Sequence, residues 1–456
     1  MYEILKSEFK NYNEIEADIR HTIGLYELYQ GRGQNWNNLD EKDYEPIRKI
    51  SNYIKKLIKE EARFMFSNTP NFLVTNKEGE PLQEYQKILD NILNNNLFEN
   101  KIIKGARDCF ISKRIAIKVN IIDGEPIVIF VPSTNFAYET MENRTDKLNK
   151  VVFFEKTVQA TNRSDERIWK QKYEIINGTC YLTEEILDGN FRQLEVIRQE
   201  ENLKINEIPC YIILNDGLSH DMFGESDVAE IIDNAIMYNK MASEDLDTLR
   251  KGMNRIIYGI DIDEEAIKQF KLKPGAFWDA TSDITADGKQ ATIGTISTDF
   301  GYNERMESAL KRIKADMYEV LNIPMISSED LKGVLTSGKA MKTLYWQLIT
   351  RCEEKFIAWK PGLRWLAKFL LLSSNKNVED IRIDVINNYP LQEDKETEKS
   401  LDLQQVNAQV MSRKAYIMKW LDKKEEAAEE EIKQIKLEQD LLEDSYTNFE
   451  MGENIE

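Results

Sequence analysis

The 456-residue sequence has few of the side chains that most often carry catalysis or hold metal. It contains four cysteines and two histidines. The cysteines are Cys109, Cys180, Cys210 and Cys352. They lie far apart and form no C-x-x-C pair, which argues against a zinc site or a disulfide framework. His220, in the polar stretch DGLSHDMFG, is more typical of a loop than of a hydrolase or metal site. We expect no metal and no cofactor.

Long apolar runs are also missing. The best candidate, FIAWKPGLRWLAKFLLL, is interrupted by Lys360, Pro361, Arg364 and Lys368, whereas a membrane span needs about 20 apolar residues. The N-terminal stretch MYEILKSEFK mixes charges and has no signal-peptide core. We therefore expect a protein that is made in the cytoplasm and has no membrane partner.

The sequence also lacks an excess of Lys and Arg over Asp and Glu, because its formal net charge is −19. Residues 422–456 carry 13 acidic and 4 basic side chains, so nearly half of the excess lies there. Tight binding to DNA depends on Lys and Arg at phosphates, so an acidic protein can contact DNA without gripping it. The acidic segment is typical of a solvated helix that keeps an assembly soluble, and it would also repel DNA.

Hydrophobic periodicity predicts an α+β protein rich in helix. Residues 1–110 carry apolar side chains three or four apart in DYEPIRKISNYIKKLIKEEARFMF and LQEYQKILDNILNNNLFENKIIKGARDCF, which is typical of amphipathic helices. From 111 to 215 the period changes to two, with D-G and N-G turns, which predicts a mostly antiparallel β region. No βαβ alternation is visible, which disfavours a doubly wound nucleotide-binding fold.

Helical spacing returns after the β region. Ser226 or Asp227 is a candidate N-cap for a helix over 224–252. A second helix, 301–322, ends at the Ile-Pro dipeptide that follows it, and a short α/β insert lies between the two.

A long helix is predicted from Gly338 onward, with Pro361 inside it. An internal proline removes a backbone hydrogen bond, so we expect a kink or a break there. VEDIRIDVINN is typical of a strand, and increasingly acidic helices follow it.

The stretch GVLTSGKAMK nearly matches the phosphate loop G-x-x-x-x-G-K-[ST]. Ala340 stands where a metal-binding hydroxyl is needed, and the preceding NIPMISSEDLK is polar where a buried strand is needed. A DNA-packaging ATPase or nuclease that uses Gly333–Ala340 is therefore the weaker alternative. The other interpretation is a flexible loop in which Thr336 or Ser337 caps the long helix.

The order of these elements resembles the portal proteins of tailed bacteriophages. The strand EIPCYIILND leads to FGESDVAEIIDNAIMYNKMASEDLD, which is similar to the family's entry into its stem. S-G-K-A at residues 337–340 is similar to the start of its long kinked helix, and VMSRKAYIMKWLDKKEEAAEEEIKQIKLEQ to its C-terminal helices. The likeness covers residues 4–438. It departs at residues 422–424, where an Asp-Pro-type turn is usual.

The resemblance implies a portal-type fold with a β-rich wing, a two-helix stem, an α/β clip, a long kinked helix and a helical crown. The implied parts are the wing (1–222, helical and then antiparallel β), a stem helix (223–254), the clip (255–299), a second stem helix (300–322), the tunnel loop (323–337), the kinked wing helix and a strand (338–391), the crown (392–443) and a disordered tail (444–456).

The resemblance also implies a function without a catalytic centre. The chain would be a subunit of a homo-oligomeric ring, typically a dodecamer, at one capsid vertex of the virion. The ring would be a channel for DNA packaging and for genome ejection. Its expected partners are double-stranded DNA in transit, without sequence specificity, the terminase large subunit, the major capsid and scaffolding proteins, and a head–tail adaptor. A soluble coiled-coil adaptor, a third class, does not explain the β region.

Three groups of residues follow as candidates for that role. The tunnel loop would contact DNA through Ser328, Glu329, Asp330, Leu331, Lys332 and Gly333. The second stem helix offers a basic group, Lys311, Arg312 and Lys314, whose alternative is a solvated face paired with nearby glutamates. Packing between copies would use Val228, Ile231, Ala235, Met306, Leu310, Ile313 and Met317, whose alternative is ordinary core within one chain.

Overall fold

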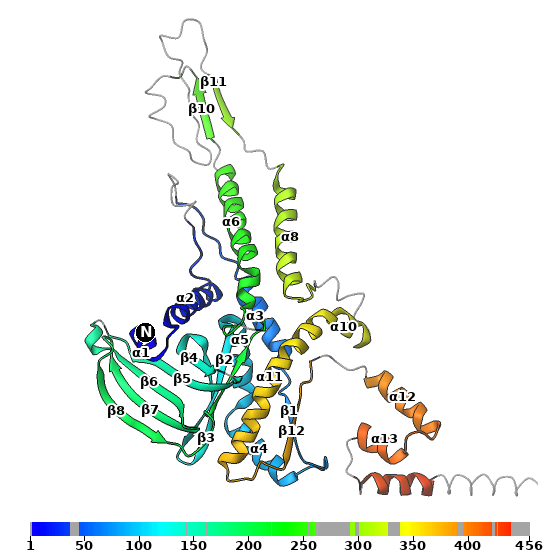
Figure 1. The fold of residues 1–456 in the computed structure, drawn as a ribbon. Coiled ribbons are helices and arrows are strands. Elements are labelled where there is room, and N and C mark those ends of the chain that lie inside the picture. Colours follow the sequence, from blue (N-terminus) through cyan, green and yellow to red (C-terminus); the bar gives the residue numbers. More distant parts are fainter. Residues whose placement is uncertain are drawn as a thin grey trace, which may run out of the picture. The chain divides into compact units, whose positions relative to one another are not determined.

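The structure is a computed structural model. It describes residues 2–36, 45–142, 144–160, 162–219, 221–253, 256–260, 262, 292–296, 301–326, 338–390, 395–421, 425 and 427–438 (Figure 1). The chain divides into two compact units. The first comprises Met1–Met325 and Gln347–Tyr389, and the second comprises Ile326–Trp346 and Pro390–Glu456. Helices and antiparallel sheets are both present, which confirms the predicted α+β class.

A five-stranded antiparallel sheet in the first unit has the order β4-β5-β6-β7-β8. Its strands are β4 (Phe136–Met141), β5 (Arg144–Val158), β6 (Arg167–Ile176), β7 (Thr179–Asp188) and β8 (Gln193–Asn202). Successive side chains of a strand point to opposite faces of the sheet, and β5 has buried residues on both faces. Val152 and Phe154 pack against helices α1 (Tyr2–Glu8) and α2 (Tyr12–Tyr29), whereas Val151 and Phe153 face the other way. Both faces of this sheet are therefore covered.

A three-stranded sheet, ordered β3-β2-β9, covers that second face. Its strands are β2 (Arg114–Ile122), β3 (Glu125–Pro132) and β9 (Cys210–Leu214). Ala116 of β2 and Cys210 of β9 share a core with Val151 and Phe153. The predicted antiparallel β region over 111–215 is thus confirmed as two packed sheets.

Three further helices and a strand pair also belong to the first unit. They are α3 (Tyr53–Phe66), α4 (Gln83–Asn95), α5 (Phe98–Ser112), and the antiparallel pair β1 (Asn71–Asn76) and β12 (Ile381–Ile386). β12 matches the predicted strand, but its partner β1 was not predicted. The long amphipathic stretch predicted after residue 81 is two helices, because Leu97 has a φ of 51° and ends the first of them.

Two helices, α6 (Asp227–Met253) and α8 (Asn303–Val320), lie side by side in this unit (Figure 1). They confirm the predicted helices 224–252 and 301–322 to within three residues. Between them in sequence the structure describes one antiparallel pair, β10 (Ile256–Ile260) and β11 (Thr292–Ile296). Most of the predicted α/β insert, and any helix within it, lies outside the described residues.

The long helix is not broken at Pro361. Helix α11 (Trp346–Ser373) runs through it, and the interruption comes instead at Tyr345, after α10 (Gly338–Leu344). Pro361 has no N–H to donate to the carbonyl of Ile357. The Ile357 side chain is 72% exposed, so this part of the helix faces water, which can satisfy that carbonyl in place of the missing donor.

In the second unit, α12 (Lys395–Asn407) contacts α13 (Arg413–Trp420). Asp402 accepts hydrogen bonds from Lys419 Nζ (2.8 Å) and Trp420 Nε1 (2.9 Å) and so joins the two helices. Lys414 pairs with Glu425 and Glu429 (2.6 and 2.7 Å) in the acidic helical segment that follows. The predicted disordered tail lies outside the described residues.

Candidate functional site

All seven predicted packing residues lie on the helix pair α6 and α8. Five of the seven are buried inside a single chain, with Val228, Ile231 and Met317 fully enclosed: Val228, Ile231, Ala235, Ile313 and Met317. α3 and α5 pack on α6, and α6 packs on α8. These five side chains therefore serve the core of one chain, which is the alternative that the sequence left open. Met306 and Leu310 are half-buried and still present surface to a neighbour.

The basic group on α8 is divided between two environments. Lys311 and Arg312 are exposed. Lys314 is half-buried, with its Nζ 5.7 Å from the ring centroid of Tyr53 on α3, at the distance of a cation–π contact. Lys311 and Arg312 are therefore the members of the group that present charge to solvent.

The predicted tunnel-loop residues Ser328–Gly333 lie outside the described residues, as does most of the near-phosphate loop. α10 begins at Gly338, where the capped-loop interpretation places the first turn of the helix. The described segment before the loop, residues 321–326, contains no strand. A phosphate loop needs a buried strand at that position, so this geometry does not favour one.

The G-E-S motif at the entry to α6 has a physical reason in the structure. Gly224 has a φ of +72°, and a Cβ there would lie 2.4 Å from the carbonyl oxygen of Lys113. Ser226 caps the helix, since its Oγ accepts a hydrogen bond from Val228 N (3.2 Å) and donates to the carbonyl of Ile111 (2.7 Å). This confirms the predicted N-cap and ties the start of α6 to the end of α5.

Further along, α6 holds an irregular segment, residues 45–51, which we call the strap. Three of its backbone N–H groups donate to three side chains of the helix: Ile47 to Asp247 Oδ1 (3.0 Å), Lys49 to Ser243 Oγ (2.9 Å) and Ser51 to Asn239 Oδ1 (2.8 Å). Alternate residues of an extended chain are about 6.7 Å apart, and four helical residues rise about 6 Å. The two repeats match, so the strap lies along α6 over two helical turns.

A cluster of charges that the sequence analysis did not identify lies at the start of α6. Its members are Glu61 of α3, Asp227 and Glu230 of α6, Arg351 and Lys355 of α11, and Asn215 after β9. Lys355 Nζ lies 2.5 Å from Asp227 Oδ2, 3.1 Å from Asn215 Oδ1 and 3.2 Å from Glu61 Oε1. Arg351 reaches Glu61 Oε1 at 2.9 Å and Asp227 Oδ1 at 3.0 Å. The cluster therefore joins α3, α6 and α11 at one point.

Electrostatics within this cluster are uneven, because three carboxylates face two cations. Glu61 is fully buried, and its Oε2 has no hydrogen-bond partner. Burial and the charge of Asp227 raise the pKa of Glu61. Burial lowers the pKa of Lys355, but Asp227 and Glu61 outweigh it and leave that pKa above its ordinary value. Because Glu61, Asp227 and Lys355 are buried and bind one another across three helices, the cluster holds these elements together.

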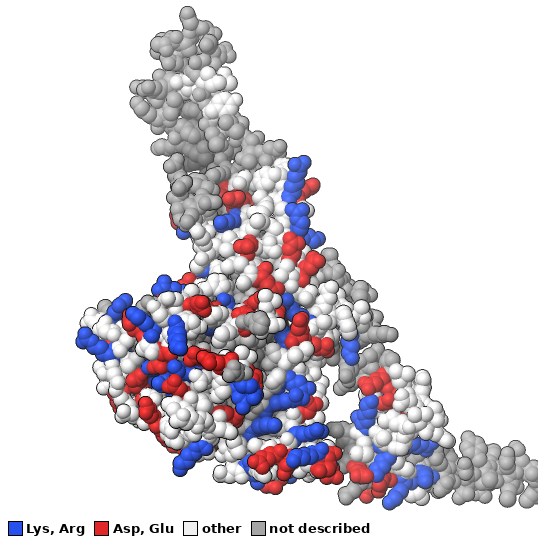
Figure 2. All heavy atoms as spheres, in the orientation of Figure 1, with Lys and Arg blue, Asp and Glu red and all other residues white. Residues whose placement is uncertain are grey.

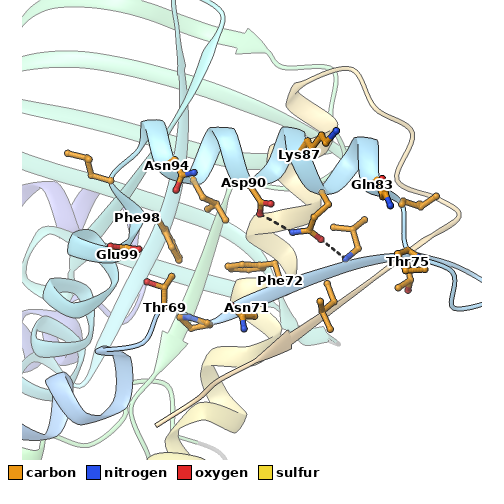
Figure 3. A pocket seen from close by; sticks show the side chains of 18 of the residues that line it. Thr69, Asn71, Phe72, Thr75, Gln83, Lys87, Asp90, Asn94, Phe98 and Glu99 are labelled. Atoms are coloured by element: carbon orange, nitrogen blue, oxygen red, sulfur yellow. Dashed lines mark hydrogen bonds between the residues drawn. The ribbon is translucent and has the colours of Figure 1, made fainter. Parts of the chain in front are cut away.

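A groove of 930 Å³ runs between β1 and the helices α4 and α5 (Figure 3). Gln86 of α4 bridges its two walls, since its Oε1 accepts a hydrogen bond from Val74 N of β1 (3.1 Å). Its Nε2 donates to Asp90 Oδ1 on the same helix (2.9 Å). The rings of Phe72 and Phe98 lie 6.0 Å apart at one end. Its lining contains neither Cys nor His, so no nucleophile–base pair built on these residues is present there.

Among the described residues, no group of three or more His, Cys, Asp or Glu side chains is placed to bind a metal ion. Within the same part of the chain, no helix combines the length and the apolar character that a membrane span requires. The features described above are thus the helix pair α6 and α8, the groove beside β1 and the cluster of charges at the start of α6.

Comparison with known proteins shows the family to which the chain belongs. Residues 9–442 match the model of the family described as phage portal protein, SPP1 Gp6-like. The chain belongs to this portal protein family. No curated protein matches the chain.

Membership of this family indicates the assembly that the chain forms. Portal proteins of this family form a homo-oligomeric ring at a capsid vertex, through which DNA passes during packaging, and they are structural components of the virion rather than known enzymes. Subunits of such a ring make head-to-tail contacts, in which two different faces of one chain meet. Within one such subunit, the buried cluster holds α6 to α3 and α11.

Proposed function

We propose that the chain is the subunit of a dodecameric portal channel, used for DNA packaging and later for genome ejection. The observation that supports this most is the family match over nearly the whole chain, residues 9–442. The same ring would dock the terminase large subunit, the major capsid and scaffolding proteins, and a head–tail adaptor. It would be made in the host cytoplasm and reside in the virion.

In this proposal α6 and α8 are the two stem helices, within residues 223–254 and 300–322. Residues 1–222 and 338–391 are the wing, 255–299 the clip and 392–443 the crown. Neighbouring copies pack against the half-buried Met306 and Leu310 of α8 and the 52% exposed Met237 of α6.

The DNA-facing surface would combine the tunnel loop over 323–337 with Lys311 and Arg312 of α8. Phosphate contacts must break at each advance of the duplex, and affinity rises steeply with the number of Lys and Arg contacts. The loop carries mixed charge, with Glu329 and Asp330 near Lys332. Such a surface touches the duplex without holding it.

Deleting residues 329–334 tests this function. We expect the purified variant to form rings of the wild-type mass by light scattering and negative-stain microscopy, and particles built with it to package little DNA. A matched control replaces the same six residues by Gly and Ser, which keeps the loop length and removes its side chains. Loss of the ring in the deletion would count against a tunnel-loop role, and normal packaging by both variants would refute DNA contact by this loop.

A further inference from the structure

A basic surface stands out on a chain whose net charge is −19. Figure 2 shows Lys and Arg side chains gathering over the region where α11 and β12 are drawn in Figure 1. We call it the basic face and define it by Lys147, Lys360, Arg364, Lys368 and Arg382. Lys360, Arg364 and Lys368 are four residues apart on α11, so they form one stripe about 12 Å long.

Carboxylates neutralise only part of this surface. Asp384 of β12 accepts from Lys360 Nζ (3.0 Å) and Arg364 Nη2 (2.7 Å). These two partners hold the pKa of Asp384 at about 2, so it stays ionised near neutral pH. Glu207 is a second carboxylate here, and it feels the positive charges of Lys147 and Lys368. Asp146, beside Lys147, is paired with Arg144 (2.7 Å), so this pair adds no net charge. The five cations of the face thus meet Asp384 and Glu207, which leaves an excess of three positive charges.

Two lysines at the edges of the basic face are paired with carboxylates. Lys376 pairs with Glu84 (2.6 Å), and Lys77 pairs with Asp380. Lys147, Lys368 and Arg382 are exposed, whereas Lys360 and Arg364 are engaged by Asp384. The first three are therefore the cations of the face that are best placed to meet a partner from solution.

We propose that the basic face binds the phosphate backbone of double-stranded DNA outside the channel. The inference rests on the family's ring and on the duplex that the ring handles. A stripe of cations spaced about 6 Å apart along a helix suits a row of phosphates, which repeat at a similar distance along one strand. The contact carries no sequence specificity, because no base edge is involved. It is weak for one copy and is strengthened in a ring, where several copies reach the same duplex.

Closed circular plasmid is the probe that separates this face from the channel, since a closed circle cannot thread a preassembled ring. We expect wild-type rings to bind it in a mobility-shift titration at 50 mM NaCl and pH 7.5. With three phosphate contacts per copy, raising the salt to 200 mM should weaken binding by about 40-fold for each copy that engages the plasmid. The double variant Lys368→Glu/Arg382→Glu should bind at least tenfold more weakly at 100 mM NaCl. The slope of its log binding constant against log salt concentration should be shallower by about two for each engaged copy.

Controls assign each outcome. Lys10→Glu makes a similar charge reversal at an exposed lysine outside the face and should bind like wild type. Light scattering reports the ring for every variant, so a loss of assembly is distinguished from a loss of DNA binding. If the double variant fails to assemble, Lys147→Glu tests the face from another element.

Two results would overturn the proposal. One is equal plasmid affinity and salt dependence in wild-type and assembled variant rings. The other is binding of a polyglutamate chain by rings that do not bind plasmid at 50 mM NaCl, which would assign the face to an acidic protein segment.

Discussion

Lys355 is the residue whose replacement tests the buried cluster most directly. Its side chain is 4% exposed, and its Nζ donates to Asp227 and Asn215 and lies 4.1 Å from the ring centroid of Phe110. Lys355→Met keeps much of the volume and removes the charge. Asp227 Oδ2 and Asn215 Oδ1 then lose this donor while they stay buried.

The loss in the free energy of unfolding follows from the carboxylates that remain buried. Removing one partner of a buried ion pair leaves an uncompensated charge, which typically destabilises a protein by about 3–5 kcal/mol. Arg351 still reaches Asp227 and Glu61, so we expect the lower part of that range. With a urea dependence of about 3 kcal/mol per molar, the unfolding midpoint should fall by roughly 1 M.

The assay is equilibrium unfolding in urea, followed by tryptophan fluorescence. Trp359 is 1% exposed and lies one helical turn after Lys355 on α11, so it reports this region. The variants must be compared in the same oligomeric state, because assembly itself adds stability.

Lys360→Met is the matched control, since it makes the same change on the same helix. Lys360 is 32% exposed and pairs with Asp384 at the surface, and such pairs contribute about 0–1 kcal/mol. The double variant Lys355→Met/Asp227→Asn should lose less than the sum of its single changes, because it removes the stranded charge. If Lys355→Met costs no more than Lys360→Met, the reasoning about the cluster is refuted.

Two other predictions concern Glu61 and Gly224. The pKa of Glu61 is higher in the folded chain than in the unfolded chain, so the folded chain holds this proton more tightly. The stability that Glu61 contributes is therefore complete below its ordinary pKa, near 4.5, and is lost as the pH rises through the raised pKa. The free energy of unfolding of wild type should therefore fall relative to that of Glu61→Gln between pH 5 and pH 8 in urea titrations; a rise would contradict the direction of the shift. Gly224→Ala should lower the free energy of unfolding by at least about 2 kcal/mol, because of the left-handed φ and the carbonyl contact. Gly24→Ala, in a helix with free space around it, should stabilise by about 0.5–1 kcal/mol, and equal effects of the two changes would disprove the backbone argument.

Local patterns were sufficient wherever one stretch of chain decides its own conformation. Helices α6 and α8 were predicted closely, because periodic apolar residues and the Ser226 cap act within a few residues. The antiparallel β region followed from alternation and from turn residues in the same way, although its division into two packed sheets was not predicted.

Structure that depends on distant partners was missed. β1 is six residues long and forms a strand because β12 pairs with it from the far end of the chain, with Phe72 opposite Val385. Its own alternation, N-F-L-V-T-N, is too short to specify that pairing. The division between α4 and α5 was missed because it depends on one residue, Leu97, in a left-handed conformation that non-glycine residues seldom adopt.

The buried cluster lies between these two cases, because the sequence contains half of its pattern. Glu61 follows Leu57 and Ile58 by four and three residues, and Lys355 lies three residues after Cys352 and four before Trp359. Each is a charged residue on the apolar face of its helix. Such a charge can be buried only with a partner, so each position predicts that an opposite charge exists. Which one it is depends on how α3 and α11 pack together, and that is set by the whole fold. A charge in the apolar register of a helix is thus a sequence-level prediction of a tertiary contact, and here two such residues of opposite sign meet each other, with Glu61 Oε1 3.2 Å from Lys355 Nζ.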